Sequence, residues 1–270
     1  MGEFEAIQRI AARFSAAPPG EVWIGDDCAV LAGGLLVAAD VVVEGVHFEP
    51  SAPLTDVGWK AVAVNVSDVA AMGGRPTHLV VTVAAPPATD LDALYDGIEA
   101  CATEFACPVV GGDLSGGPVM AVSVTVLGTT DGRPPVLRAG ARPGDGIWVT
   151  GALGGGAASG YRRRPTPRVE QGVAAATAGA TAMIDVSDGL GADLGHVLEA
   201  SGVGAELVEG AVPLAAGATL EQAMGGGDDY ELVFTGPDGA GAAAGATRIG
   251  TIVADRRVRP PASGWQHRFA

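Results

Sequence analysis

The chain has 270 residues, of which 48% are hydrophobic, with 42 glycines and a formal net charge of −15 at pH 7. This composition predicts a compact α/β protein and excludes a disordered chain. The negative charge argues against nucleic acid as a partner, because binding to its phosphates relies on Lys and Arg. No signal-peptide pattern or long apolar run is present, so we expect no membrane span. The three cysteines are not spaced as a zinc site, which predicts reduced thiols and a cytoplasmic location.

Hydrophobic spacing predicts helices and strands that alternate through the first half of the chain. The expected segments are helix 3–14, strand 22–24, strand 35–43, helix 56–72 with Thr55 as its N-cap, strand 80–84, helix 91–105, strand 109–110 and strand 118–127. Aspartates occur where these segments begin, end or are most apolar. Asp27 lies in a turn between strands, where solvation is an equally good explanation, and Asp113 follows a strand and two glycines. Asp40 interrupts a β-branched strand, and a buried charge there costs several kcal/mol unless it is paired.

The stretch from residue 133 to 145 contains prolines, glycines and three arginines, which is typical of a linker. We therefore expect two domains, 1–136 and 137–270. The second half begins with a strand and a glycine-rich loop at 151–156, but Ser159 stands where a dinucleotide-binding fingerprint needs its third glycine. The basic cluster at 162–164 is either a solvated turn or a phosphate contact.

The strand 182–185 ends in Asp185, and Ser187 and Asp188 follow just before a helical pattern. Helix capping explains Ser187 and Asp188, but it gives no reason for a charge at Asp185. Similar glycine and aspartate corners recur along the chain. The aspartates of this kind are Asp27, Asp40, Asp68, Asp113, Asp185, Asp188, Asp228 and Asp229.

Clustered carboxylates repel one another unless cations lie between them. Lys60 is the only lysine and Ala61 follows it, which excludes a Gly-Lys-Ser/Thr phosphate loop. A protein of this composition that handles nucleotide phosphates needs Mg²⁺ for much of the positive charge. The physical inference is a nucleotide-triphosphate site with several Mg²⁺ ions. Structural Ca²⁺ is the alternative, although no EF-hand spacing supports it.

The motifs, taken in order, resemble those of the thiamine-monophosphate kinase family. They are Gly25-Asp-Asp-Cys-Ala-Val-Leu31, Glu44-Gly-Val-His-Phe48, Gly58-Trp-Lys-Ala-Val-Ala-Val-Asn-Val-Ser-Asp-Val-Ala-Ala-Met-Gly73, Gly111-Gly-Asp113, Ile184-Asp-Val-Ser-Asp-Gly-Leu190 and Asp229-Tyr-Glu-Leu-Val-Phe-Thr235. The resemblance implies the α/β fold of the aminoimidazole-ribonucleotide synthetase superfamily. In that fold an N-terminal domain forms a homodimer through its sheet, and ATP with several Mg²⁺ ions lies in the cleft to a C-terminal domain.

The resemblance also implies a role for individual residues. The metal ligands would be Asp27, Asp40, Asp68, Asp113, Asp185 and Asp188. The ATP contacts would be Gly112, Asp113, Arg138 and Ser187. The thiamine monophosphate contacts would be His47, Asp228 and Trp265, and the Trp265 ring could stack on the cationic thiazolium.

The implied reaction transfers the γ-phosphoryl group of ATP to the phosphate of thiamine monophosphate. That phosphate has a second pKa of about 6 and is already an anion near neutral pH, so we expect no proton-abstracting residue.

The chain departs from the family at Ala38-Ala39, where hydroxyl residues are usual, and at Asp228, where glutamate is usual. It is also shorter after Gly154 and between Val208 and Gly225. Two other hypotheses are an ATP-dependent enzyme of the superfamily with a different acceptor, and a non-catalytic nucleotide- or metal-binding relative.

Overall fold

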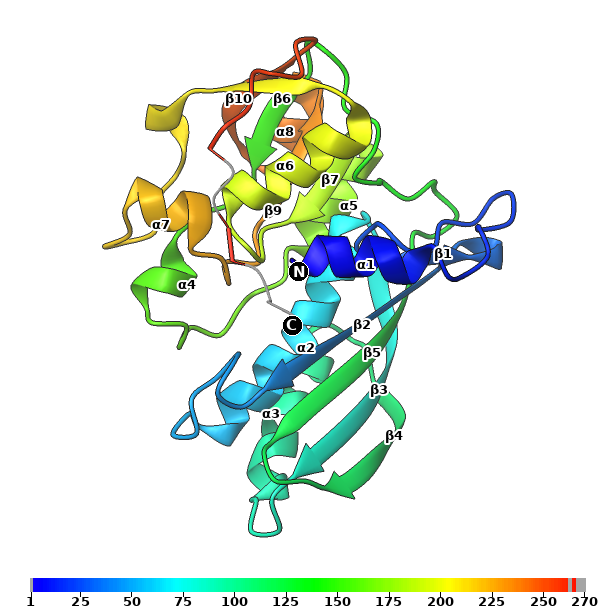
Figure 1. Ribbon diagram of the computed structural model, residues 1–270, viewed down its shortest axis with the longest axis vertical. Helices are drawn as coiled ribbons and strands as arrows, with labels where there is room; N and C mark the ends of the chain where they lie inside the picture. Colours follow the sequence, from blue (N-terminus) through cyan, green and yellow to red (C-terminus); the bar gives the residue numbers. More distant parts are fainter. Residues whose placement is uncertain (1, 262–263, 266–270) are drawn as a thin grey trace.

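The computed structural model describes residues 2–261 and 264–265, and it divides into two α/β units (Figure 1). Each unit is built on a five-stranded sheet, and residues 130–145 connect them. The elements of the first unit are α1 (Glu3–Ala11), β1 (Ala29–Leu31), η1 (Ala32–Gly34), β2 (Leu35–Val43), α2 (Leu54–Ala71), β3 (Arg75–Ala85), α3 (Leu91–Glu104), β4 (Val109–Gly116) and β5 (Ala121–Thr129). The expected mixed α/β class is confirmed.

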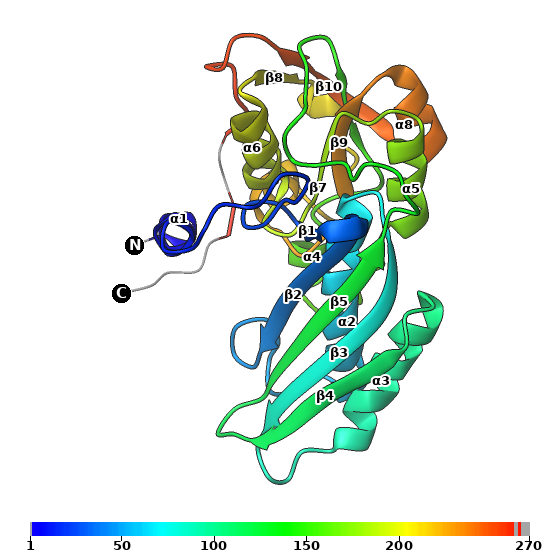
Figure 2. The same ribbon diagram turned by 90° about the vertical axis from the view of Figure 1, so that its right-hand side faces the viewer.

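The first sheet has the strand order β1-β2-β5-β3-β4, and α2 and α3 cover one of its faces. Figure 2 looks onto the other face, which none of the described helices covers. Helix α2 is buried over most of its length because valine and alanine dominate it. Gly58 and Gly97 allow α2 and α3 to pack closely, because a Cβ at either position would collide with the backbone of the other helix. The predicted N-cap Thr55 is wrong: the helix starts at Leu54 after Pro53, whose ring fixes φ at a value suited to a helix start.

The second unit follows the connection. Its elements are β6 (Gly146–Val149), α4 (Gly155–Ala158), α5 (Val169–Thr177), β7 (Ala182–Asp185), α6 (Leu190–Ser201), β8 (Gly204–Leu207), η2 (Glu209–Ala211), α7 (Leu220–Gly225), β9 (Leu232–Gly236), α8 (Asp238–Ala244) and β10 (Thr247–Val253). The strand order is β7-β9-β6-β10-β8, and every neighbouring pair is antiparallel.

The two units share a hydrophobic core. Along the strands of the second sheet, Trp148, Met183 and Phe234 join the core that contains α2, while their neighbours Ile147 and Ile184 pack in a separate cluster beneath α6. Helix α2 also contacts α5 and β7 directly. This packing places the C-terminal end of β7 beside the C-terminal part of α2, where the aspartates of both units meet.

The connection passes from one unit to the other near the predicted boundary. Val136 N donates a hydrogen bond to Met72 O, and Leu137 O accepts one from Met183 N. The boundary at residue 136 nevertheless stays a prediction, because the shared core joins both sides of it. Within residues 2–261 and 264–265, no helix combines the length and apolar character that a membrane crossing requires.

Candidate functional site

Three of the predicted metal ligands, Asp27, Asp68 and Asp185, form one cluster. Each contributes a carboxylate oxygen, and these oxygens all lie within 4.8 Å of one another. Asp27 comes from the turn before β1, Asp68 from α2, and Asp185 from the last position of β7. Ser67, the neighbour of Asp68 on α2, donates a hydrogen bond of 2.6 Å from its hydroxyl to Asp185 Oδ2. The three aspartates, which lie far apart in the sequence, therefore meet at the junction between the two units.

The cluster is strongly acidic and poorly solvated. Burial, followed by the negative charge of Asp27, raises the pKa of Asp185 to about 8. Burial, then Asp40 and Asp185, raises the pKa of Asp68 well above its ordinary value. Asp27 Oδ2 is buried and has no hydrogen-bond partner among the described residues. A set of oxygen donors with an unsatisfied buried oxygen either keeps protons or takes up hard cations such as Mg²⁺.

Asp40 and Asp188 border this cluster. Burial and then the charge of Asp27 raise the pKa of Asp40, whose backbone N–H donates to Asn65 Oδ1 at 2.9 Å. Burial and then Glu3 raise the pKa of Asp188 to about 6, and Asp40 contributes to this shift. Asp27 thus acts on Asp40, and Asp40 acts on Asp188, as expected for carboxylates that border one acidic region.

Arg138 brings a cation to the cluster from the connection between the units. Its Nη2 pairs with Asp27 Oδ1 at 2.8 Å, and its backbone N–H donates to Asp26 Oδ2 at 3.1 Å. Burial, partly opposed by this backbone hydrogen bond, raises the pKa of Asp26 to about 6. Arg138 Nε is buried without a partner in the described part of the chain, so the guanidinium retains an unsatisfied donor at the site.

The corner after β7 is not capped by Ser187. Helix α6 begins at Leu190 with Gly189 as its N-cap, and Ser187 lies outside it with an exposed side chain. The buried carboxylate of Asp193 instead accepts the backbone N–H groups of Asp188 at 3.1 Å and Gly189 at 3.0 Å. The capping interpretation of Ser187 is therefore wrong, because an acid within the helix reaches back to the same orphan donors.

The segment 227–230 lies directly against this corner. Asp228 N donates to Ser187 O at 2.7 Å, and Tyr230 N donates to Val186 O at 2.9 Å. Asp228 and Tyr230 adopt φ angles of 61° and 53°, in the left-handed region that non-glycine residues rarely occupy. Such strain persists where surrounding contacts enforce it, and it concentrates at functional sites. Asp229 is a structural residue here, since its carboxylate accepts the N–H groups of Gly154 and Gly156 at 2.6 and 3.0 Å.

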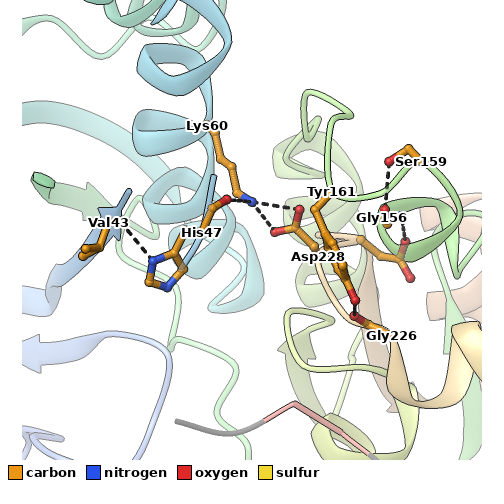
Figure 3. Close-up of polar contacts among 9 residues, drawn as sticks. Val43, His47, Lys60, Gly156, Ser159, Tyr161, Gly226 and Asp228 are labelled. Atoms are coloured by element: carbon orange, nitrogen blue, oxygen red, sulfur yellow. Dashed lines mark hydrogen bonds and ion pairs between the residues drawn. The ribbon is translucent and has the colours of Figure 1, made fainter. Parts of the chain in front are cut away.

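The three residues predicted to meet the acceptor lie together near the same corner. Lys60 Nζ contacts Asp228 Oδ1 at 2.7 Å and also donates to His47 O at 3.1 Å (Figure 3). The Trp265 ring lies 6.3 Å from the His47 ring at an interplanar angle of 59°, and Trp265 N donates to Asp188 O at 3.2 Å.

The orientation of the His47 ring fixes which nitrogen can donate. His47 Nδ1 accepts the backbone N–H of Val43 at 3.0 Å, so in the neutral ring the proton is assigned to Nε2.

Comparisons with known proteins agree with this geometry. Residues 25–130 match the family model described as AIR synthase related protein, N-terminal domain. The chain is 41% identical to the thiamine-monophosphate kinase of Mycobacterium tuberculosis, over 89% of this chain and 83% of that protein. It is 34% identical to the thiamine-monophosphate kinase of Escherichia coli K12, over 88% and 83% of the two chains. The chain belongs to the thiamine-monophosphate kinase family.

Solved structures of this family share the fold. A structure described as AaThiL complexed with AMPPCP and TMP is 32% identical, has a TM-score of 0.89, and is matched over 98% of this chain and 97% of that chain. The thiamine-monophosphate kinase from Stenotrophomonas maltophilia has a TM-score of 0.78 at 34% identity, over 97% and 98% of the two chains. The resemblance seen in the motifs and the fold that it implied are therefore confirmed.

Two of the residues predicted for the ATP and metal site, Gly112 and Asp113, do not lie at the acidic cluster. They lie on the edge strand β4, three strands away from Asp40 on β2, which is a distance of about 14 Å. Asp113 lies opposite Thr82 on β3, which is exposed. Asp40 lies opposite Val124 on β5, which is buried on the face that the helices cover. Within one chain, Asp113 and Asp40 therefore project from opposite faces of the sheet.

The sequence missed the part played by Lys60. The lysine was considered only as evidence against a phosphate loop, yet it contacts both His47 and Asp228, the latter 168 positions away in the sequence. A single lysine in a helix rich in valine and alanine was the available signal. Its partners could not be identified without the fold.

Proposed function

We propose that this protein transfers the γ-phosphoryl group of ATP to thiamine monophosphate and forms thiamine diphosphate. The observation that carries the proposal is the contact between the two groups of site residues. The acidic cluster and the acceptor group share the corner after β7, because Ser187 O and Asp188 O accept the backbone N–H groups of Asp228 and Trp265. Donor and acceptor phosphates bound to these groups would lie next to each other, as in-line transfer requires.

Mg²⁺ fits the donor set of the acidic cluster. The residues proposed to hold the ions are Asp27, Asp40, Asp68, Asp185 and Asp188. Bound Mg²⁺ would neutralise the triphosphate and the charge that develops during transfer. The fit rests on the buried, unpartnered Asp27 Oδ2 and on a cluster made only of oxygen ligands. Ser67 would hold the Asp185 carboxylate in one orientation through its hydroxyl.

The nucleotide would also meet protein donors. Arg138 is held by Asp26 and Asp27, and its buried Nε remains available for a phosphate oxygen. Ser187 has an exposed side chain beside the corner, where it could donate to the same anion. No proton-abstracting residue is assigned, because the acceptor phosphate is an anion near neutral pH with a second pKa of about 6.

The acceptor would be bound by His47, Asp228 and Trp265. A histidine side chain is suited to a phosphate oxygen, and the Asp228 carboxylate to a cationic ring or an amine. Trp265 is 43% exposed, which leaves ring surface for stacking on the thiazolium.

A homodimer would complete the site. The uncovered face of the first sheet exposes Leu35, Val41 and Val80, which are 39%, 45% and 37% accessible. Apolar side chains on one uncovered face are typical of a protein interface. Gly112 and Asp113 lie too far from the acidic cluster of their own chain, so we propose that they serve the ATP and metal site of a second copy. The buried free thiols Cys28, Cys101 and Cys107 are consistent with a cytoplasmic location.

A steady-state assay with purified protein tests the proposal. With ATP, Mg²⁺ and thiamine monophosphate, we expect thiamine diphosphate and ADP in equal amounts, and no product when EDTA replaces Mg²⁺. If ADP forms only with another phosphorylated acceptor, the enzyme belongs to the family but has a different substrate. If the protein binds ATP without turnover of any acceptor tested, the non-catalytic alternative holds.

A further inference from the structure

We propose that Lys60 is a positioning residue of the acceptor site and sets its affinity for the phosphorylated acceptor. The ammonium group joins the Asp228 carboxylate of the second unit to the His47 segment of the first (Figure 3). The inference rests on the proposed function, because it takes His47 and Asp228 as contacts of the acceptor. Three features of the geometry support it.

The first feature is the way the ammonium uses its hydrogen-bond donors. Lysine has three N–H donors, and Lys60 Nζ lies 2.7 Å from Asp228 Oδ1, 2.8 Å from Asp228 Oδ2 and 3.1 Å from His47 O. Two of these contacts, to Asp228 Oδ2 and His47 O, are hydrogen bonds, and the contact with Asp228 Oδ1 is an ion pair. Lys60 therefore acts on a bound acceptor through its two partners.

The second feature is the burial of the ion pair. Lys60 is only 7% exposed, and the Asp228 side chain is 13% exposed. A buried lysine is costly unless its charge is compensated, and the four residues that follow it on α2 are alanine and valine. An apolar side chain would satisfy the packing of this helix. We therefore attribute the charge of Lys60 to its role in orienting the Asp228 carboxylate and the His47 carbonyl.

The third feature is that Lys60 fixes group orientations that backbone hydrogen bonds do not determine. The Asp228 backbone is held by Ser187 O, but the orientation of its carboxylate depends on side-chain partners. The ammonium contacts both carboxylate oxygens and the Tyr230 hydroxyl hydrogen-bonds to the same carboxylate, which leaves part of its acceptor capacity for the bound acceptor. The same ammonium holds the carbonyl of His47, whose ring is held by Val43 N.

Helix α2 relates this arrangement to the metal cluster. Lys60 and Asp68 lie eight residues apart on the same helix, which corresponds to about 12 Å along its axis. One rigid element therefore fixes both the acceptor contacts and a metal ligand. Loss of the lysine should loosen the acceptor contacts and leave the nucleotide contacts in place.

The test is steady-state kinetics of Lys60→Met, which keeps the side-chain length and removes the charge. We expect the KM for thiamine monophosphate to rise at least about tenfold, with the KM for ATP changed less than about twofold. Lys60→Arg restores a cation and should recover part of the loss. Asp228→Asn and the double variant should raise the KM by similar factors, because the lysine acts through the carboxylate.

Arg75→Met is the matched control. It removes another ion pair between the two units, the exposed one with Glu170, and should leave both KM values unchanged. The inference is overturned if Lys60→Met lowers only the melting temperature, or if it raises the KM values for ATP and acceptor equally. Wild-type turnover tests the proposed function separately. If the wild type shows no turnover, calorimetric titration with thiamine monophosphate replaces the KM: weaker binding by Lys60→Met supports the inference, and equal binding or no wild-type binding overturns it.

Discussion

Replacement of Asp185 by asparagine should have opposite effects on stability with and without Mg²⁺. Asp185 is 4% exposed, and burial followed by the charge of Asp27 raises its pKa from 3.8 to about 8. The folded chain therefore binds a proton that the unfolded chain releases. This contribution is fully present below about pH 4 and is lost as the pH rises to about 8. One pH unit corresponds to about 1.4 kcal/mol, so wild-type stability should fall by up to about 4 kcal/mol between about pH 4 and pH 7 in EDTA.

Asparagine has the shape of the protonated acid and keeps an oxygen for the Ser67 hydroxyl. In EDTA at about pH 7, Asp185→Asn should therefore be more stable than the wild type, by at most about 4 kcal/mol. Mg²⁺ at about 100 times its dissociation constant should stabilise the wild type by about 2.7 kcal/mol and the variant much less. Urea denaturation in EDTA and in Mg²⁺, at several pH values, measures both effects. A variant that is less stable in EDTA, or that gains as much from Mg²⁺ as the wild type, would refute the reasoning.

Three further substitutions test separate parts of the structure. Asp193→Ala leaves two backbone N–H groups at the start of α6 without their acceptor, so denaturation should show a loss of about 1–3 kcal/mol; an unchanged midpoint would contradict the cap. Trp265→Ala should raise the KM for thiamine monophosphate about tenfold and Trp265→Phe much less, whereas equal effects would argue against stacking. Val80→Glu places a charge on the uncovered face of the first sheet and should shift size-exclusion elution from dimer to monomer. Val208→Glu, on the second unit, is its control, and a dimeric Val80→Glu protein would remove this face as the interface.

The acidic cluster could be predicted because its signal is local. Asp185 ends a buried strand and Asp68 lies in an apolar helix, so each charge is anomalous in its own segment. The two carboxylates then had only to lie close to each other in the folded chain to form a cluster. The resemblance added their order along the chain, and in the structure Asp27, Asp68 and Asp185 lie together.

Other features depend on tertiary distances that no local pattern contains. Ser187 was the cap expected from the sequence, and only the fold shows that the Asp193 carboxylate accepts the backbone N–H groups of Asp188 and Gly189. The separation of Asp113 from the cluster follows from the register of β3 and β4, which sets the face on which it lies. The pairing of Lys60 with Asp228 joins two units and depends on how they pack.

A single-turnover experiment tests the central claim most directly. Enzyme in excess is mixed with ATP labelled in its γ-phosphate, thiamine monophosphate and Mg²⁺, and the labelled products are separated. We predict that the label moves into thiamine diphosphate, and that Asp68→Asn, which lacks one carboxylate of the cluster, transfers almost none. Label found only in inorganic phosphate, or equal transfer by Asp68→Asn, would contradict phosphoryl transfer at this site.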